Sequence, residues 1–444
     1  MKLSKYNYFT RNENQELLLF NTMNGSNSFM KVSRENASAA EEFLSGKGDD
    51  CGLSRSLYDE LVKWGYVIPD DFDEEVLLRE IYVDSISDPK LQITILPTEQ
   101  CNFRCKYCYE SFPDKVMSEE TQNAVLLFLK KNLSKYSALH ISWFGGEPLL
   151  ALDIIERLSE KIKEICSFYK KAFTASITTN GFLLDVDTFK RLLKCNVLYY
   201  QITVDGTKEI HDAQRPHEHL HVSTYDKVVG NLKEIKSHVK NGMFRITIRS
   251  NFSKLHFGKI EEYKKNFAGL FGDDKRFQFL VRPVMDWGGE SVCDFKDNLV
   301  DSGGLDAFYD ALISCDSKLN FIYGTLLNCA GAVCEAGKKN AFVIVPDGGI
   351  YKCTCHFEDP ETRIGKLQKD GNLEIDSYAA ARWLCDPSHC GTGCFYAPIC
   401  LKDSCSAVKV LKEENKSNCP LGKRNLSKIL QLLDRDNHAF RRVD

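Results

Sequence analysis

The sequence predicts an α/β protein built around a parallel sheet of six strands, either curled into a partial barrel or laid open, with a smaller module on each side. From Leu91 onward, strand-like apolar runs alternate six times with amphipathic helical segments. Nine of the eighteen cysteines lie between Cys334 and the C-terminus, where apolar runs become short. A chain of 444 residues is too long to fold around one ordinary hydrophobic core. We therefore expect three domains, at residues 1–85, 86–320 and 321–444.

Composition restricts the possible functions. A formal charge of −4, with basic residues scattered along the chain, does not favour nucleic acid or an anionic membrane as a partner. No run of 18 apolar residues is present, and the N-terminus lacks the pattern of a secretory signal. We therefore predict a cytoplasmic protein, in which clustered thiols more often bind metal than form disulfides.

The barrel segments follow one another in a regular order. The predicted strands are 91–97, 138–144, 173–179, 197–204, 244–251 and 276–283. The predicted helices between them are 118–133, 152–166, 186–195, 225–236 and 259–271. The first of these helices opens with Ser118 and two acids, which suit an N-cap and the helix dipole. Such alternation favours a parallel sheet.

The two flanking modules differ in character. Before the barrel, short strands at 6–10, 17–23 and 28–33 precede helices at 35–44 and 53–65. After about Ala330, cysteine and glycine dominate, so metal would have to supply missing stability. A closing helix at 426–436 is expected to pack on the body.

Three cysteines stand directly after the first barrel strand. Cys101, Cys105 and Cys108 lie in the segment CNFRCKYCYE. Three thiolates at this spacing can hold a four-iron cluster and leave the fourth iron open. The alternatives are a zinc site with a distant fourth ligand, or three unrelated thiols.

This segment, with Tyr107 before its last cysteine, resembles the signature of the radical S-adenosylmethionine (radical SAM) superfamily. The resemblance implies a partial (β/α)6 TIM-like barrel in which the methionine part of the cofactor chelates the open iron. Reductive cleavage of the cofactor would then give a 5′-deoxyadenosyl radical that abstracts hydrogen. The protein's task is to align cofactor and substrate and to exclude water.

Later strand ends support this resemblance. The second strand ends in Gly145, Gly146, Glu147 and Pro148, similar to the family's GGE motif, which helps to bind the methionine amino group. By the same resemblance, the residues expected near the cofactor carboxylate and ribose are Thr178, Asn180, Asp205 and Arg215. Asn180 and Asp205 could instead only cap turns. Arg249, Asn251 and Arg282 close the fifth and sixth strands and could position peptide or cofactor, or form structural ion pairs. No catalytic acid or base is assigned.

The tail resembles the SPASM extension of radical peptide-modifying enzymes, which binds two auxiliary four-iron clusters. The resemblance gives the first auxiliary cluster Cys334, Cys353 and Cys405, with Cys329 or Cys355 as a candidate fourth ligand. It gives the second Cys390, Cys394, Cys400 and Cys419. Here three residues separate the third and fourth cysteines of the pattern and four the fifth and sixth, whereas the family usually has two and three. The expected total is three [4Fe–4S] clusters, and a zinc-ribbon tail is the alternative.

Seven cysteines have no ligand position in this pattern, or could take a position that is assigned to another cysteine. Cys355 and Cys385 could replace an assigned neighbour. The remaining five are expected to be ordinary buried thiols: Cys51, Cys166, Cys195, Cys293 and Cys315.

The N-terminal module indicates the substrate class. Its strand and helix order resembles the RiPP recognition element (RRE), a winged-helix domain that binds the leader of a precursor peptide by adding it to a sheet edge. A structural cap is the alternative. The whole layout is similar to the maturases of sactipeptides and ranthipeptides, which implies thioether formation, fed by a reductant such as flavodoxin or ferredoxin. The rivals are carbon–carbon crosslinking, epimerisation, anaerobic sulfatase maturation and, outside enzymes, a multi-cluster electron carrier.

Overall fold

The computed structural model describes residues 1–48, 52–240, 242–300, 327–330, 333–384, 393–401, 405–411, 421–435 and 439–444. The chain forms two compact units. The first comprises Met1–Ser87, Asp306–Lys338 and Leu384–Asp444, and the second comprises Asp88–Leu305 and Lys339–Trp383. Within the described ranges, no helix combines the length and the apolar character that crossing a bilayer requires.

The first unit contains the strands and helices expected before the barrel. They are β2 (Asn7–Arg11), β3 (Leu17–Asn21), β4 (Met30–Val32), α1 (Arg34–Leu44) and α2 (Arg55–Lys63). A small second sheet pairs β1 (Lys2–Leu3) with β5 (Val67–Ile68). Ser54 caps α2 by accepting a hydrogen bond from the Leu57 amide at 3.1 Å. Helix α3 (Glu74–Ile86), capped by Asp73, is an element that the sequence analysis missed.

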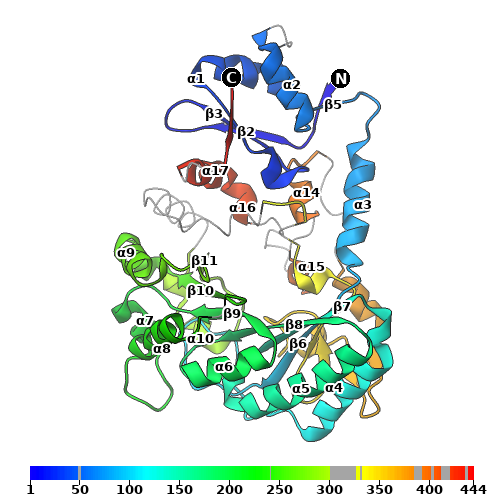
Figure 1. Cartoon of the computed structure of the whole chain (residues 1–444), viewed down its shortest axis with the longest axis vertical. Helices are drawn as coiled ribbons and strands as arrows, with labels where there is room; N and C mark the ends of the chain where they lie inside the picture. Colours follow the sequence, from blue (N-terminus) through cyan, green and yellow to red (C-terminus); the bar gives the residue numbers. More distant parts are fainter. Residues whose placement is uncertain are drawn as a thin grey trace. The chain divides into compact units, whose positions relative to one another are not determined.

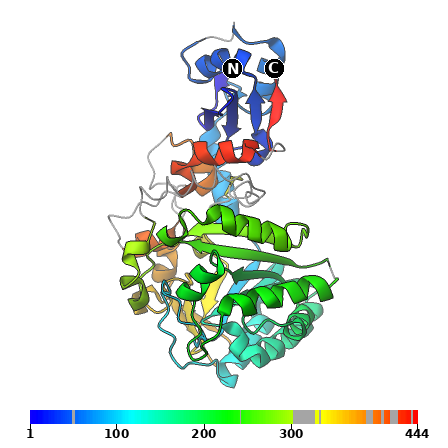
Figure 2. The same ribbon diagram turned by 90° about the vertical axis from the view of Figure 1, so that its left-hand side faces the viewer.

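The C-terminal segment completes this unit. Its elements are α14 (Ala397–Cys400), α15 (Ser406–Val410), α16 (Leu421–Arg424), α17 (Leu426–Arg435) and β16 (Arg441–Val443). Strand β16 pairs in parallel with β4, so the sheet order is β16-β4-β3-β2. Figures 1 and 2 show this strand, in red, beside the blue strands of the N-terminus. The expected closing helix is α17, which rests on β2 and β4 through Ser427 to Thr10 at 2.6 Å and Asp434 to Lys31 at 2.8 Å.

Strand β16 contributes core as well as hydrogen bonds. The Val443 side chain is buried in the same apolar cluster as Met30 and Val32. The ring of Phe440 stacks on Phe29 with centroids 5.0 Å apart. The N-terminal sheet therefore depends on residues more than 400 positions away in sequence.

A charge placed at Val443 should therefore destabilise the first unit. We expect Val443→Asp to lower the free energy of unfolding by about 3 kcal/mol, because it buries an unpaired carboxylate. Val443→Ala removes two methyl groups and should cost less than about 2 kcal/mol. The first transition in urea, followed by circular dichroism, measures both. Equal effects of the two variants would contradict a buried position.

The second unit holds the six predicted barrel strands. They are β6 (Leu91–Thr98), β7 (Ala138–Gly145), β8 (Ala172–Thr179), β9 (Val197–Thr203), β10 (Arg245–Phe252) and β11 (Phe277–Pro283). They lie in the order β11-β10-β9-β8-β7-β6, and every neighbouring pair is parallel. This open sheet confirms the predicted partial barrel.

Helices cover the outer face of that sheet (Figure 1). They are α4 (Glu119–Asn132), α5 (Leu152–Phe168), α6 (Val186–Lys194), α7 (Lys208–Gln214), α8 (Thr224–His238) and α9 (Ile260–Phe271). Ser118 caps α4 through the Thr121 amide at 3.2 Å, as predicted. Outward apolar side chains of the strands meet these helices: Phe279 of β11 lies 4.5 Å, between ring centroids, from Phe267 of α9. The alternate side chains therefore face the inside of the barrel.

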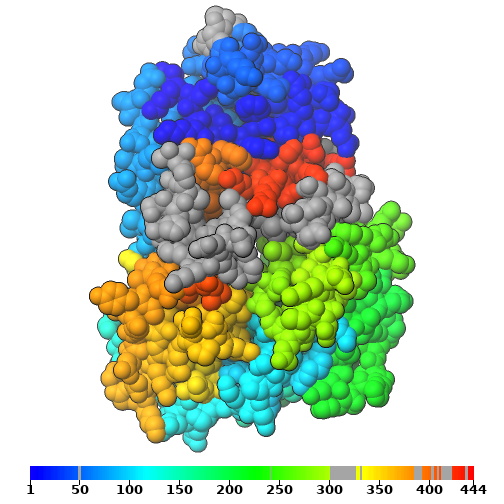
Figure 3. Space-filling view, turned by 180° about the vertical axis from the view of Figure 1, so that it is seen from behind, coloured from blue at the N-terminus to red at the C-terminus, as the bar shows by residue number. Residues whose placement is uncertain are grey.

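Residues 339–383 extend the barrel sheet. Strand β12 (Ala341–Ile344) adds in parallel to β6, and three antiparallel strands follow: β13 (Gly349–Tyr351), β14 (Gly365–Leu367) and β15 (Leu373–Ile375). Figure 3 shows these residues, in yellow and orange, against the cyan surface of α4, and Lys369 reaches Glu120 of α4 at 2.8 Å. Two short helices, α10 (Glu290–Cys293) and α13 (Ser377–Arg382), complete the unit.

Candidate functional site

The cysteine loop occupies residues 99–117, between β6 and α4. It leaves the sheet at Thr98 and is closed at its base by backbone hydrogen bonds. The Glu99 amide donates to the Lys115 carbonyl at 3.0 Å, and the Met117 amide donates to the Pro97 carbonyl at 2.9 Å. The loop therefore projects from the carboxyl edge of the sheet, where loops of parallel strands converge.

The three cysteines of this loop gather in one buried cluster. Cys101 and Cys105 pack around Phe103, with Cys108 and Tyr107 alongside. Burial raises the pKa of all three thiols, and the charge of Cys105 raises that of Cys101 and Cys108 further. Buried thiolates that repel one another need a positive centre between them, so these residues fit an iron–sulfur cluster.

The described residues show no convergent site for a single metal ion. Among the described residues, no three His, Cys, Asp or Glu side chains converge on a point where one metal ion could bind. A mononuclear zinc site needs such convergence, whereas thiolates that bind different irons of a cluster stand farther apart.

The segment after β9 is docked against the cysteine loop. The amides of Arg104 and Lys106 donate to the carbonyls of Pro216 and Gln214 at 3.0 and 2.9 Å. Arg215 lies between Gln214 and Pro216 in the sequence. Its guanidinium lies over the Phe103 ring, 5.6 Å from the ring centroid. The loop and this segment therefore form one wall.

Tyr107 links this wall to two strand ends. Its hydroxyl contacts the Asp205 carboxylate and accepts hydrogen bonds from Arg215 at 2.8 Å and from the Asn251 side chain at 3.2 Å. The backbone amide of Asn251 donates to the other oxygen of the Asp205 carboxylate at 2.7 Å. Burial raises the pKa of Tyr107, so it stays a neutral phenol. The Nε of Arg215 is buried and has no hydrogen-bond partner among the described residues, and this leaves a donor for a ligand.

Glu147 joins the ends of β7 and β8. Its carboxylate is fully buried and accepts hydrogen bonds from the Leu149 amide at 3.0 Å, the Thr179 hydroxyl at 2.7 Å and the Asn180 amide at 2.7 Å. Burial raises its pKa, and these bonds oppose that shift. These three hydrogen bonds hold the ends of β7 and β8 together, and a cofactor-binding role of Glu147 stays a prediction.

The paired glycines allow close packing of the backbone. Gly145 has φ of +116°, and a Cβ there would lie 2.1 Å from the Thr98 carbonyl oxygen. A Cβ on Gly146 would lie 2.3 Å from the Gln100 carbonyl oxygen. Any side chain would push β7 away from the cysteine loop. Pro148 then begins a short 3-10 helix, Pro148–Ala151.

The Asn180 side chain makes two hydrogen bonds. Its Oδ1 accepts from the Phe182 amide at 2.9 Å, which is the predicted turn cap, and its Nδ2 donates to Asn102 at 2.7 Å. Thr178 lies half-buried on β8. Asn102 and Thr179 were not among the residues predicted for the site. Strand alternation could have identified Thr179, because it shares the buried face with Ile177.

The tail cysteines fall in both units. Cys329, Cys334, Cys394, Cys400 and Cys405 belong to the first unit, and Cys353 and Cys355 to the second. Cys390, Cys419 and Cys385 lie outside the described residues. The auxiliary ligand sets therefore stay predictions.

The isolated cysteines behave differently from one another. Cys166 and Cys195 are buried, and burial raises the pKa of both thiols, as expected for structural residues. Cys293 is exposed, contrary to the expected buried thiol. Cys51 and Cys315 lie outside the described residues.

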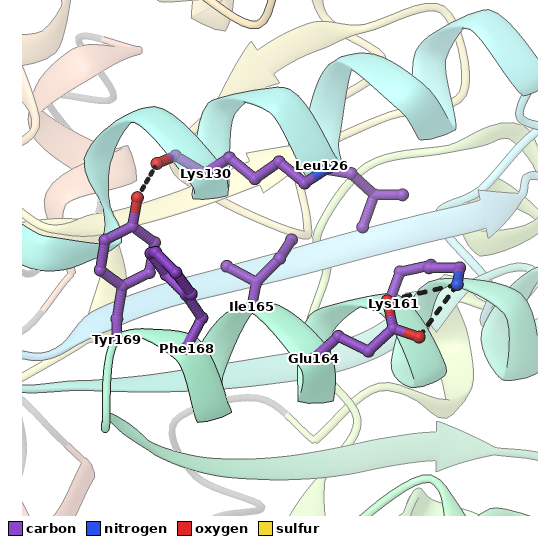
Figure 4. Close-up of a pocket in the computed structure, with 7 residues that line it drawn as sticks. All are labelled: Leu126, Lys130, Lys161, Glu164, Ile165, Phe168 and Tyr169. Atoms are coloured by element: carbon purple, nitrogen blue, oxygen red, sulfur yellow. Dashed lines mark hydrogen bonds and ion pairs between the residues drawn. The ribbon is translucent and has the colours of Figure 1, made fainter.

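A surface groove of about 370 Å³ lies between α4 and α5, and no residue of the cysteine loop lines it (Figure 4). Its lining includes Leu126, Ile165 and the exposed Phe168, and the Tyr169 hydroxyl donates to the Lys130 carbonyl at 2.6 Å. Phe168 ends α5, which runs back from the carboxyl edge of the sheet, so this end of the groove lies toward the opposite edge.

Comparison with known proteins identifies the barrel. Residues 95–261 match the Radical SAM superfamily. These residues form a radical SAM domain. This assignment implies S-adenosylmethionine and one [4Fe–4S] cluster, for which the cysteine loop supplies suitable residues.

Two curated relatives show how far the likeness extends. A cysteine-type anaerobic sulfatase-maturating enzyme of Clostridium perfringens (strain 13 / Type A) is 26% identical over 304 residues, which cover 63% of this chain and 78% of the relative. A GTP 3′,8-cyclase of Campylobacter jejuni subsp. doylei is 37% identical over 116 residues, 26% of this chain and 34% of the relative. The second name gives a nucleotide substrate, so likeness over part of the barrel does not fix the substrate.

A solved structure shares the fold of the radical SAM enzyme. Native anSMEcpe with bound AdoMet and Cp18Cys peptide superposes with a TM-score of 0.58 at 20% identity, covering 79% of this chain and 99% of that one. At this identity the likeness establishes the fold alone.

Proposed function

We propose that this radical SAM enzyme installs thioether crosslinks between a cysteine sulfur and a carbon of a ribosomally made precursor peptide. The single observation that supports this most is the strand and helix module ahead of the barrel, with β2, β3 and β4 followed by α1 and α2. Its order resembles the RRE, and the cysteine-rich tail resembles SPASM. A relative named for maturing sulfatases is consistent with a polypeptide substrate.

Different residues of the chain would bind the cluster and the cofactor. Cys101, Cys105 and Cys108 would hold the cluster, and Arg215 would donate its unpartnered Nε to the cofactor carboxylate. When bound, cluster and cofactor supply hydrogen abstraction and accept one electron. Forming one carbon–sulfur bond removes two hydrogen atoms from the peptide, one from carbon and one from the thiol. One hydrogen leaves the carbon as an atom and the thiol hydrogen leaves as a proton, so formation of the carbon–sulfur bond releases one electron. The auxiliary clusters, with the predicted ligand sets, would receive this released electron.

Leader binding has a structural constraint. In the described sheet the edges are β2 and β16, and β16 fills the place beside β4. A leader strand would therefore add to the outer edge of β2 or of β16, or displace β16 from β4.

Anaerobic sulfatase maturation is the second candidate, because the relative of Clostridium perfringens carries that name. Carbon–carbon crosslinking and epimerisation would use the same site. These reactions differ in what they do to a substrate cysteine, so the product separates them.

The test uses the anaerobically reconstituted enzyme, S-adenosylmethionine, dithionite and a short cysteine-rich peptide encoded beside the gene. We expect the peptide to lose two hydrogen atoms per crosslink, and the crosslinked cysteine to resist alkylation by iodoacetamide. A Cys105→Ser enzyme is the control. Cofactor turnover with every cysteine still alkylated would overturn the thioether proposal, and deuterium uptake from D₂O without mass loss would indicate epimerisation.

A further inference from the structure

Two arginines lie diagonally across neighbouring strands on the inner face of the barrel sheet, because the register pairs Arg249 with Leu280 and Asn251 with Arg282. On β10, Ile248 faces the helices, where it lines the same apolar cluster as Tyr263, so Arg249 points to the opposite face. On β11, Phe279 packs on α9, so Arg282 also points inward. The two strands are neighbours in parallel register. We call Arg249 and Arg282 the arginine pair.

The arginine pair has no acidic partner among the described residues. Among the described residues, Arg249 makes one side-chain hydrogen bond, from Nε to the Asn251 side chain at 2.8 Å, and Arg282 makes none. Neither forms an ion pair within the described ranges. Burial and the charge of Arg282 lower the pKa of Arg249, which shows that the two charges oppose each other.

Nearby groups do not neutralise the pair. The charge of Asp205 acts on Arg249 and opposes the lowering of its pKa, but within the described ranges its carboxylate forms no hydrogen bond or ion pair with either arginine. Cys355 also lies near Arg249, and a single thiol cannot match two guanidinium groups. Two adjacent, half-buried cations without an anion are unfavourable, and a bound carboxylate would satisfy both through bidentate hydrogen bonds.

We propose that the arginine pair binds a carboxylate of the substrate peptide, either an acidic side chain or the C-terminus. This proposal rests on the proposed peptide substrate. Arg215 already stands at the cysteine loop with an unpartnered donor suited to the cofactor, so the cofactor does not need the pair. The enzyme would thus select peptides with a negative charge near the modified residue.

The test measures binding by the cofactor-loaded, reconstituted enzyme. The probes are two dansyl-labelled, C-terminally amidated hexapeptides, Gly-Cys-Gly-Glu-Gly-Gly and its Gln counterpart, and the Gln peptide with a free C-terminus. Fluorescence anisotropy gives each dissociation constant. We expect a carboxylate to tighten binding by about tenfold, and Arg282→Gln to reduce this preference to within about twofold. Comparing the Glu peptide with the free-acid peptide tells which source of carboxylate is bound.

Two controls make the result specific. Arg245→Gln changes an exposed arginine at the other end of β10 and should keep the full preference. Circular dichroism and cofactor affinity should be unchanged in Arg282→Gln. An undiminished preference in Arg282→Gln, equal binding of all three peptides, or lost cofactor affinity would each overturn the proposal. The assay measures binding without turnover. Its result therefore does not depend on whether the enzyme forms thioethers.

Discussion

Replacing Cys105 with serine is expected to reduce 5′-deoxyadenosine formation to the level measured without enzyme. Cys105 is buried at the centre of the loop cluster, and its charge acts on both Cys101 and Cys108. Loss of one of three thiolates removes a cluster ligand that nothing else in the loop can replace. Liquid chromatography of the cofactor products, with an iron determination on the same sample, measures the effect.

The matched control is Cys293→Ser, which changes an exposed cysteine outside the loop. It should leave both cofactor cleavage and iron content unchanged. If Cys105→Ser still formed 5′-deoxyadenosine at the wild-type rate, the assignment of the cysteine loop as the cluster site would be wrong.

Replacing Glu147 with alanine should give the largest loss of stability in the barrel. The variant leaves three buried donors without an acceptor, at Leu149, Thr179 and Asn180. We expect the free energy of unfolding to fall by about 3 kcal/mol, since each unsatisfied buried donor costs on the order of 1 kcal/mol or more. Urea denaturation followed by circular dichroism measures it, and cofactor cleavage should fall because the ends of β7 and β8 are no longer joined.

Two variants control for this effect. Glu160→Ala removes an exposed carboxylate of α5 and should change stability by less than about 0.5 kcal/mol. Glu147→Gln keeps one acceptor oxygen, so its loss should lie between those of the other two variants. A Glu147→Ala enzyme as stable as wild type would show that the carboxylate does not hold the two strand ends together.

Local sequence patterns predicted the barrel well. Each strand from β6 to β11 begins and ends within one residue of the predicted range, because alternating apolar runs and helix caps such as Ser118 are local signals. The same patterns located the glycines of β7, but they did not reveal why glycine is needed. The 2.1 Å approach of a Gly145 Cβ to the Thr98 carbonyl depends on how two strand ends pack.

Other features have no local signal. Strand β16 is three residues long, and only its pairing with β4 makes it a strand. Asn102 lies within the cysteine motif, yet its bond to Asn180 spans 78 positions. Strand β12 was read as part of a metal-stabilised tail, and in the structure it extends the barrel sheet beside β6.

The sequence by itself determined the parallel α/β barrel, the cysteine loop and the radical SAM signature, because residue spacing along a strand, helix or ligand loop is written locally in the chain. Tertiary structure alone decided that Glu147 joins two strand ends through three hydrogen bonds, that Tyr107 joins Asp205 to Arg215, and that Arg249 and Arg282 share one face with no acidic partner in the described part of the chain. These properties depend on which distant groups are neighbours and on the loss of water around them, and neither is encoded in any single segment.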